Sequence, residues 1–192
     1  MVRAILDDRK TQTRRPIDWD ISNSMSGDAA SGYLVQTDNG LIDALKLYRY
    51  QKGDILYVRE TFVDISEIIP GNIHYKASAT KADLEWLREE GWKWKPSIHM
   101  PKEAARIFLR VTDVRIERIQ DITPENSIAE GLEVCIDCYN HGGCYLPKVC
   151  NYLPATMKKL WDGIYAQRGY GWVNNPFVWV IEFERCEKQD GN

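Results

Sequence analysis

A change of phase inside one long β-strand most constrains how this chain can fold. Over residues 105–119 apolar side chains alternate with polar ones up to Val111, and the alternation resumes one position out of phase at Val114. Alternation with a period of two is typical of a half-buried strand, and one extra residue within it is typical of a β-bulge. The sequence therefore predicts a long strand with a bulge or bend at Thr112-Asp113.

The remaining segments favour a small mixed fold. Further strands are predicted over residues 55–63, 73–77 and 177–183. Helices are predicted over residues 2–10, 82–90 and 157–165, and from Thr123-Pro124 to Gly131. Residues 16–40 are rich in Ser, Gly, Asp and Asn and predict a long loop, and residues 41–50 predict a short helix or turn. Several strands separated by short helices indicate an α+β barrel and not a parallel βαβ sheet, and no internal repeat divides residues 1–192 into more than one domain.

Charge and hydropathy exclude several classes of protein. The formal net charge of −3 argues against a basic coat that grips long duplex DNA. No apolar run reaches the roughly 18 residues that a membrane-spanning helix needs. The first residues carry Asp7 and Asp8 and do not resemble a signal peptide, so a cytoplasmic location is expected.

Cations and hydroxyls gather near the start of the chain. The group consists of Arg9, Lys10, Thr11, Thr13, Arg14 and Arg15. Such a group suits a phosphate, an oxyanion or a polarised carbonyl, although a solvated run of surface charge is the alternative. Arg59, on a predicted strand, could project into the mouth of the barrel or form a surface ion pair with Glu60 or another neighbour. Trp92, Trp94 and Tyr170 could stack on exposed bases or simply pack in the core.

Four of the five cysteines lie close together in a segment that interrupts the mixed fold. They are Cys135, Cys138, Cys144 and Cys150. The first two form a CxxC pair, which is a common half-site for tetrahedral zinc, and four thiolates leave no open position for catalysis. The spacing therefore predicts an insertion at about residues 132–154 pinned by structural zinc. Free thiols in a loop, or disulfides formed after purification, are the alternatives.

The opening segment resembles the ASCH family, a branch of the PUA-like β-barrels. It reads Asp8-Arg9-Lys10-Thr11-Gln12-Thr13-Arg14-Arg15, where the family motif is of the type Gly-x-Lys-Thr-x-x-x-Arg and Asp8 stands at the Gly position. Three later blocks agree in order: residues 53–58, 122–130 and 180–183. The combination is similar to ASCH-type proteins carried by phages and prophages, and more distantly to the small bacterial acetylcytidine amidohydrolases. This resemblance implies a PUA-like mixed β-barrel flanked by short helices.

The resemblance also implies a site and a chemistry. In the small amidohydrolases a Lys, a Thr and a later Glu form the catalytic set, and the matching residues are Lys10, Thr13 and Glu130. Thr13 would be the nucleophile, Lys10 its base and Glu130 an orienting acid, although Glu130 could instead hold the amine charged. Positions 10 and 13 share a face on a helical turn but not on a strand, so this role requires a helical or irregular backbone.

We therefore expect a pocket for RNA, a nucleotide or a modified nucleoside, with hydrolysis of an N-acylated cytidine as its sharper version. The residues expected to bind the substrate are Arg9, Thr11, Arg14, Arg15 and Arg59. A non-catalytic adaptor of phage origin that binds RNA or protein is the competing hypothesis.

Overall fold

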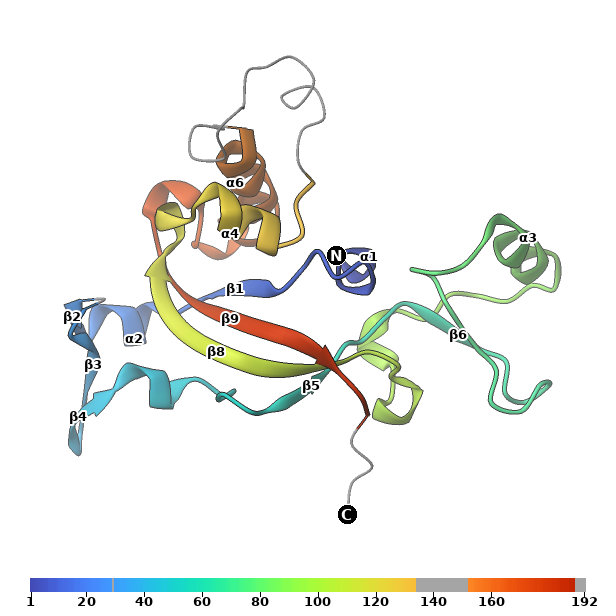
Figure 1. The fold of residues 1–192 in the computed structure, drawn as a ribbon, viewed down its shortest axis with the longest axis horizontal. Coiled ribbons are helices and arrows are strands. Elements are labelled where there is room, and N and C mark those ends of the chain that lie inside the picture. Colours follow the sequence, from blue (N-terminus) through green and yellow to red (C-terminus); the bar gives the residue numbers. More distant parts are fainter. Residues whose placement is uncertain (29, 134–151, 189–192) are drawn as a thin grey trace.

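One curled antiparallel sheet organises the chain. The structure is a computed structural model that describes residues 1–28, 30–133 and 152–188. Four strands run in the order β1-β9-β8-β5 and form a half-barrel (Figure 1). They are β1 (Gln12–Pro16), β5 (Ile55–Tyr57), β8 (Phe108–Arg118) and β9 (Phe177–Cys186). The predicted α+β class is confirmed at this level. No helix among the described residues is both long enough and apolar enough to cross a bilayer.

Strand β8 carries the irregularity that its sequence predicts. Its pairing with β9 shifts register between Val111 and Asp113. Thr112 is therefore the extra residue, and a bulge of this kind bends a strand and increases its local twist. The predicted bulge is confirmed.

Helices cover one face of the sheet, which we call the helix face. Val178 and Val180 of β9 pack there against Trp161 of α6 (Tyr152–Tyr165). Helix α4 (Pro124–Ala129) lies beside α6 on the same side (Figure 1). Both helices occupy the positions that the sequence predicts.

The opposite face, which we call the open face, is partly covered by a segment predicted to be a loop. That prediction is wrong, because regular elements occupy it. They are α2 (Trp19–Asn23), β2 (Met25–Asp28), β3 (Gly32–Thr37) and β4 (Gly40–Asp43). The three strands form an antiparallel sheet of their own. Val35 is buried with Trp179 and Ile181 of β9, so contact with the main sheet stabilises these short strands, each of which contains a glycine.

The first helix is shorter than predicted. α1 spans Val2–Leu6, and the chain then turns back, with the backbone N–H groups of Arg9 and Lys10 both donating to the carbonyl of Ala4. Asp8 adopts a left-handed conformation with φ of 54°. This backbone geometry favours glycine, and Asp is among the few other residues that tolerate it. The turn delivers Lys10 to the start of β1.

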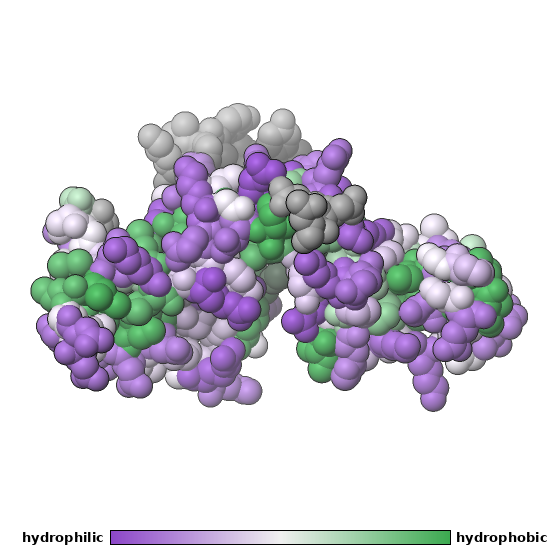
Figure 2. All heavy atoms as spheres, turned by 90° about the horizontal axis from the view of Figure 1, so that it is seen from below, coloured by the Kyte–Doolittle hydropathy of each residue, from purple (hydrophilic) through white to green (hydrophobic). Residues whose placement is uncertain are grey.

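The predicted strand over residues 55–63 is broken in two. Its first part is β5, and its second part, β6 (Phe62–Asp64), pairs with β7 (Ile73–Tyr75) away from the main sheet. Together with α3 (Lys81–Glu89) this hairpin forms one end of the molecule, and a hollow partly separates it from the rest (Figures 1 and 2).

The aromatic loop that follows α3 belongs to this end of the molecule. Trp92 and Trp94 pack there against a cluster of buried residues that includes Val63 and Leu87. Of the two roles open to these tryptophans, their contacts favour packing.

Candidate functional site

Strand β1 divides the basic segment between the two faces of the sheet. Successive residues of a strand point to opposite faces, and residues directly opposite each other on neighbouring strands share a face. Thr13 lies opposite Ile181 of β9, and Ile181 belongs to the open face. Thr13 and Arg15 therefore face the open side, whereas Gln12 and Arg14 are buried on the helix face.

Lys10 and Glu130 meet on the helix face, as the family resemblance implies. Glu130 is the C-cap residue of α4, and its carboxylate Oε2 lies 2.7 Å from Lys10 Nζ. The same ammonium donates to the backbone carbonyls of Gln12, at 2.7 Å, and of Glu130, at 2.8 Å. The two side chains are only 2% and 6% exposed. Lys10 thus uses all three of its N–H donors inside the protein and joins β1 to α4.

A larger charge network surrounds this pair. Its members, all at most 34% exposed, are Lys10, Arg14, Arg115, Glu117, Glu130 and Glu182, three cations and three carboxylates. At the exposed end of the network, Arg115 also pairs at 3.6 Å with Asp113, whose side chain is 52% exposed. Arg14 is fully buried and bridges Glu130, at 3.2 Å, and Glu117, at 3.0 Å. Arg115 continues the chain from Glu117 to Glu182. Of the buried side-chain nitrogen and oxygen atoms that the structure describes, only the Nε of Arg14 has no hydrogen-bond partner. Equal numbers of opposite charges make the burial of this network tolerable.

The catalytic arrangement that the resemblance implies is only partly assembled. Burial lowers the pKa of Lys10, and the neighbouring carboxylate of Glu130 opposes that shift. The Thr13 hydroxyl, however, lies across the sheet and accepts a hydrogen bond of 2.9 Å from Arg15 Nη1. The helical or irregular backbone that the catalytic role requires is not found, because residues 12–16 form a strand. The structure brings Lys10 to Glu130 and does not bring Thr13 to either of them.

Gly131 shows how tightly the Lys10–Glu130 corner is packed. Its φ is +88°, and a Cβ at this position would lie 2.9 Å from the Cβ of Ala4 and 3.0 Å from the Cβ of Lys10. Gly131→Ala is expected to lower the free energy of unfolding by about 2–4 kcal/mol, because backbone strain and overpacking add. Gly91→Ala is the control, since Gly91 also has a positive φ, of +74°, but open space around its Cβ position. Equal losses in urea unfolding of the two variants would contradict the close packing.

The other predicted substrate-binding residues lie apart. Arg9 pairs with Asp7 at 3.1 Å, near the start of the chain. Thr11 is exposed, and its backbone N–H donates to the carbonyl of Ala129. Arg59 donates to the carbonyl of Ile98 at 3.2 Å. None of these three is among the residues that line the cavity described next.

The possible ion pair between Arg59 and Glu60 is likewise not found among the described residues. Glu60 is buried and pairs instead with Arg106, at 2.9 Å.

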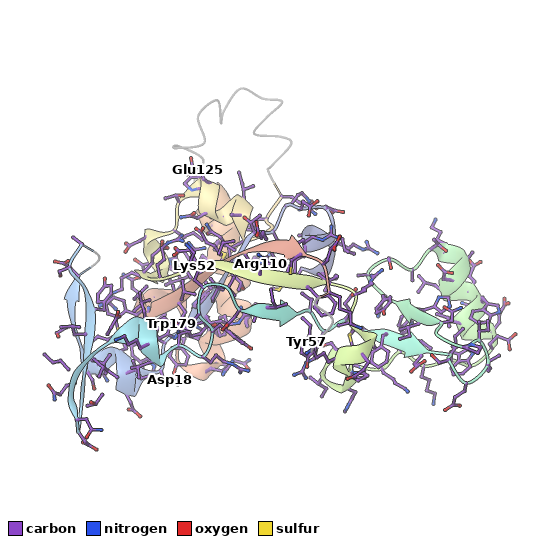
Figure 3. The ribbon with its side chains drawn as sticks, turned by 60° about the horizontal axis from the view of Figure 1, so that its bottom comes forward. Asp18, Lys52, Tyr57, Arg110, Glu125 and Trp179 are labelled. Carbon is purple, nitrogen blue, oxygen red and sulfur yellow. The ribbon has the colours of Figure 1, made fainter. Side chains whose placement is uncertain are left out.

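The open face of the sheet contains a cavity of about 590 Å³. Thr13 and Arg15 line it, together with Tyr48, Tyr50 and Trp179. Asp18 and Tyr57 also line it, and Figure 3 shows Asp18 and Trp179 near one end and Tyr57 towards the β5 end. Of the predicted site residues that the structure describes, therefore, only Thr13 and Arg15 reach this cavity.

Three aromatic rings follow one another along the cavity. The ring centroids of Trp179 and Tyr48 are 5.0 Å apart, and those of Tyr48 and Tyr50 are 5.7 Å apart. The guanidinium of Arg49 lies over the ring of Tyr50, 4.6 Å from its centroid. Burial raises the pKa of the Tyr48 hydroxyl, so this group stays neutral near neutral pH. We call Tyr48, Tyr50 and Trp179 the aromatic row.

The aromatic row is not among the site residues predicted from the sequence. Residues 41–50 were expected to form a helix or turn, and the structure has a short 3₁₀ helix, Ala44–Leu47, after which the chain is extended at Tyr48. The signal was the order Tyr48-Arg49-Tyr50, in which an extended backbone turns both tyrosines to one side. Tyr170, expected to stack on a base or pack in the core, stacks on Trp19 at 5.4 Å.

The predicted zinc ligands Cys135, Cys138, Cys144 and Cys150 lie outside the described residues. Within the described residues no group of three or more His, Cys, Asp or Glu side chains is arranged to hold a metal ion. Structural zinc therefore stays a prediction from the sequence.

Fold and site together define a mixed α+β protein with a half-barrel sheet and an aromatic cavity on its open face. No family model, characterised protein or solved structure gives a significant match to the chain.

Proposed function

We propose that this protein binds a nucleobase in the cavity on the open face, carried by a nucleotide, a modified nucleoside or single-stranded RNA. The observation that carries the proposal is the aromatic row beside Arg15 and Thr13. Every base has a π-face that stacks on aromatic rings, and the polar groups of the base edge need hydrogen-bond partners. The cavity offers both kinds of contact.

The polar groups around the cavity suit the edge of a base. Arg15 supplies N–H donors, and the Asp18 carboxylate supplies acceptor oxygens. The Asp18 Oδ1 atom accepts a long hydrogen bond of 3.3 Å from the Tyr170 hydroxyl. A base with an exocyclic amine and a ring or carbonyl acceptor would use both groups.

The buried charge network supports a binding function more than a hydrolytic one. For hydrolysis, Lys10 would have to act as a general base and reach the Thr13 hydroxyl. Lys10 is instead buried on the other face of the sheet, and all three of its N–H donors are in use. The ion pair between Lys10 and Glu130 joins the start of β1 to the end of α4. β1 in turn presents Thr13 and Arg15 to the cavity. On this proposal the ASCH-like motif maintains the binding surface, within a PUA-like fold.

Titration of the protein with the four nucleosides, their monophosphates and a short single-stranded RNA tests the proposal. Binding is followed by calorimetry. Tyr50→Leu is expected to weaken binding about 5- to 100-fold, because stacking on one aromatic side chain contributes about 1–3 kcal/mol. Trp86→Leu is the control, because Trp86 is an exposed aromatic residue of α3 that does not line the cavity. Failure of all these ligands to bind would contradict the proposal.

Acetylcytidine belongs in the same titration. The protein is expected to bind acetylcytidine without hydrolysing it. Turnover that Lys10→Arg abolishes, in a variant that remains folded, would instead support the amidohydrolase hypothesis.

A further inference from the structure

We propose that the ligand of this cavity carries a phosphate group, and that Arg15 and Arg49 bind it. This inference rests on the proposed function, because it specifies which nucleobase ligands the same cavity selects. It concerns the charges at the cavity, whereas the proposed function rests on the aromatic row.

The Arg15 guanidinium has N–H groups that donate to no partner in the described part of the protein and are free to bind a ligand. Its Nη1 donates to the Thr13 hydroxyl at 2.9 Å and to the backbone carbonyl of Arg14 at 2.8 Å. These two contacts orient the guanidinium. Its Nε and Nη2 groups have no protein acceptor among the described residues, and no carboxylate there pairs with it. An oriented guanidinium with a free edge suits the two oxygens of a phosphate.

Arg49 supplies a second cation at the same cavity. It is exposed, its guanidinium lies over the Tyr50 ring, and it too has no carboxylate within ion-pair distance in the part of the chain that the structure describes. A cation resting on an aromatic face keeps its N–H groups available at its edges. Arg9, Arg14 and Arg106, in contrast, are paired with carboxylates.

Both cations act on the hydroxyl of Tyr48. The positive charges of Arg15 and Arg49 each oppose the rise that burial causes in the pKa of this group. The Tyr48 hydroxyl, which stays protonated, therefore lies within the field of both guanidiniums and can donate a hydrogen bond to the same anion. Among the described residues that line the cavity, Asp18 is the one carboxylate, which leaves these side chains with an excess of positive charge in a chain of formal charge −3.

The source of the phosphate is either a mononucleotide or the backbone of single-stranded RNA. The decisive comparison uses cytidine, cytidine 5′-monophosphate and an RNA tetranucleotide without terminal phosphates, with the other three bases in parallel. The monophosphate or the tetranucleotide is expected to bind about 10- to 100-fold more tightly than the nucleoside, since charge-assisted hydrogen bonds are about twice as strong as neutral ones. The preference should decrease as the salt concentration rises.

Three variants identify the residues that cause the preference. Arg49→Gln is expected to reduce this preference to a few-fold while leaving nucleoside binding within about threefold of the wild type. Arg15→Gln is also expected to reduce the preference, and it should weaken nucleoside binding as well, because Arg15 also donates to the edge of the base. Arg88→Gln, an exposed arginine of α3 outside the cavity, should change neither value. Because Arg15, Arg49 and Arg88 are all exposed, these variants should stay folded, which circular dichroism checks.

The outcomes separate this inference from the proposed function. Equal affinity for nucleoside, monophosphate and tetranucleotide would overturn the phosphate site and leave the nucleobase site standing. A preference for phosphate that survives both arginine replacements would also overturn it. Absence of binding by every ligand would overturn both.

Discussion

Glu130→Gln is expected to lower the free energy of unfolding by about 3–5 kcal/mol, the usual cost of breaking a buried ion pair from one side. The carboxylate of Glu130 contacts Lys10 at 2.7 Å and Arg14 at 3.2 Å, and both cations are almost completely buried. Without it two buried positive charges face each other, and the network carries three cations and two carboxylates. Urea unfolding of the variant and the wild type measures the loss.

Two further variants make this prediction specific. Glu133→Gln is the matched control, because the Glu133 side chain is 84% exposed and should contribute less than about 0.5 kcal/mol. The double variant Lys10→Met/Glu130→Gln restores equal numbers of opposite charges, so it should be more stable than Glu130→Gln alone. If the double variant lost the sum of the two single losses, the two residues would not be coupled, and our account of the network would be wrong.

Arg106→Met is expected to destabilise the protein by a similar amount, about 3–5 kcal/mol. Arg106 binds both carboxylate oxygens of Glu60 at 2.9 Å, and the Glu60 side chain is only 1% exposed. The guanidinium also lies over the ring of Tyr75, 4.0 Å from its centroid. Because Glu60 lies between β5 and β6, and Tyr75 belongs to β7, this arginine joins the β6–β7 hairpin to the chain that enters β8. Its removal leaves a buried carboxylate without a cation.

Arg110→Met is the control for this second prediction, since Arg110 is exposed on β8 and pairs with no carboxylate among the described residues. The midpoint of thermal unfolding should therefore be clearly lower for Arg106→Met than for Arg110→Met. Glu60→Gln combined with Arg106→Met should recover part of the stability that Arg106→Met loses. A loss in Arg106→Met no larger than in Arg110→Met would show that Glu60 is hydrated and not dependent on its partner.

Much of the secondary structure was predictable, because it follows from local patterns. The bulge in β8 appears as a change of phase at Thr112, and α4 begins after Thr123, whose side chain caps it, with Pro124 in the first turn. Residues 16–40 were not predictable in this way. Their strands are short and each contains a glycine, and burial of Val35 against the main sheet contributes stability that such short strands lack on their own.

The site was predictable in part. Pairing of Lys10 with Glu130, 120 residues apart, followed from the family resemblance, and the two side chains meet. The position of Thr13 did not follow, because whether residues 10 and 13 share a face depends on the backbone conformation between them. Tyr48 and Tyr50 were not identified at all, because their importance comes from their position beside Trp179 of β9.

The amino-acid order alone determined most of the main strands and helices, with β1 as the exception, since alternation, capping residues and glycine positions act within a few residues of one another. The meeting of Lys10 with Glu130 was an expectation from the family resemblance, and the structure brings the two side chains together. Only the tertiary structure decided that β1 places alternate members of the basic segment on opposite faces of the sheet, so that Lys10 is buried and Arg15 reaches the cavity. The physical reason is that pairing with β9 sets which side chains of β1 point to each face of the sheet, and contact with the end of α4 buries Lys10. Both β9 and α4 lie more than 100 residues away in the chain.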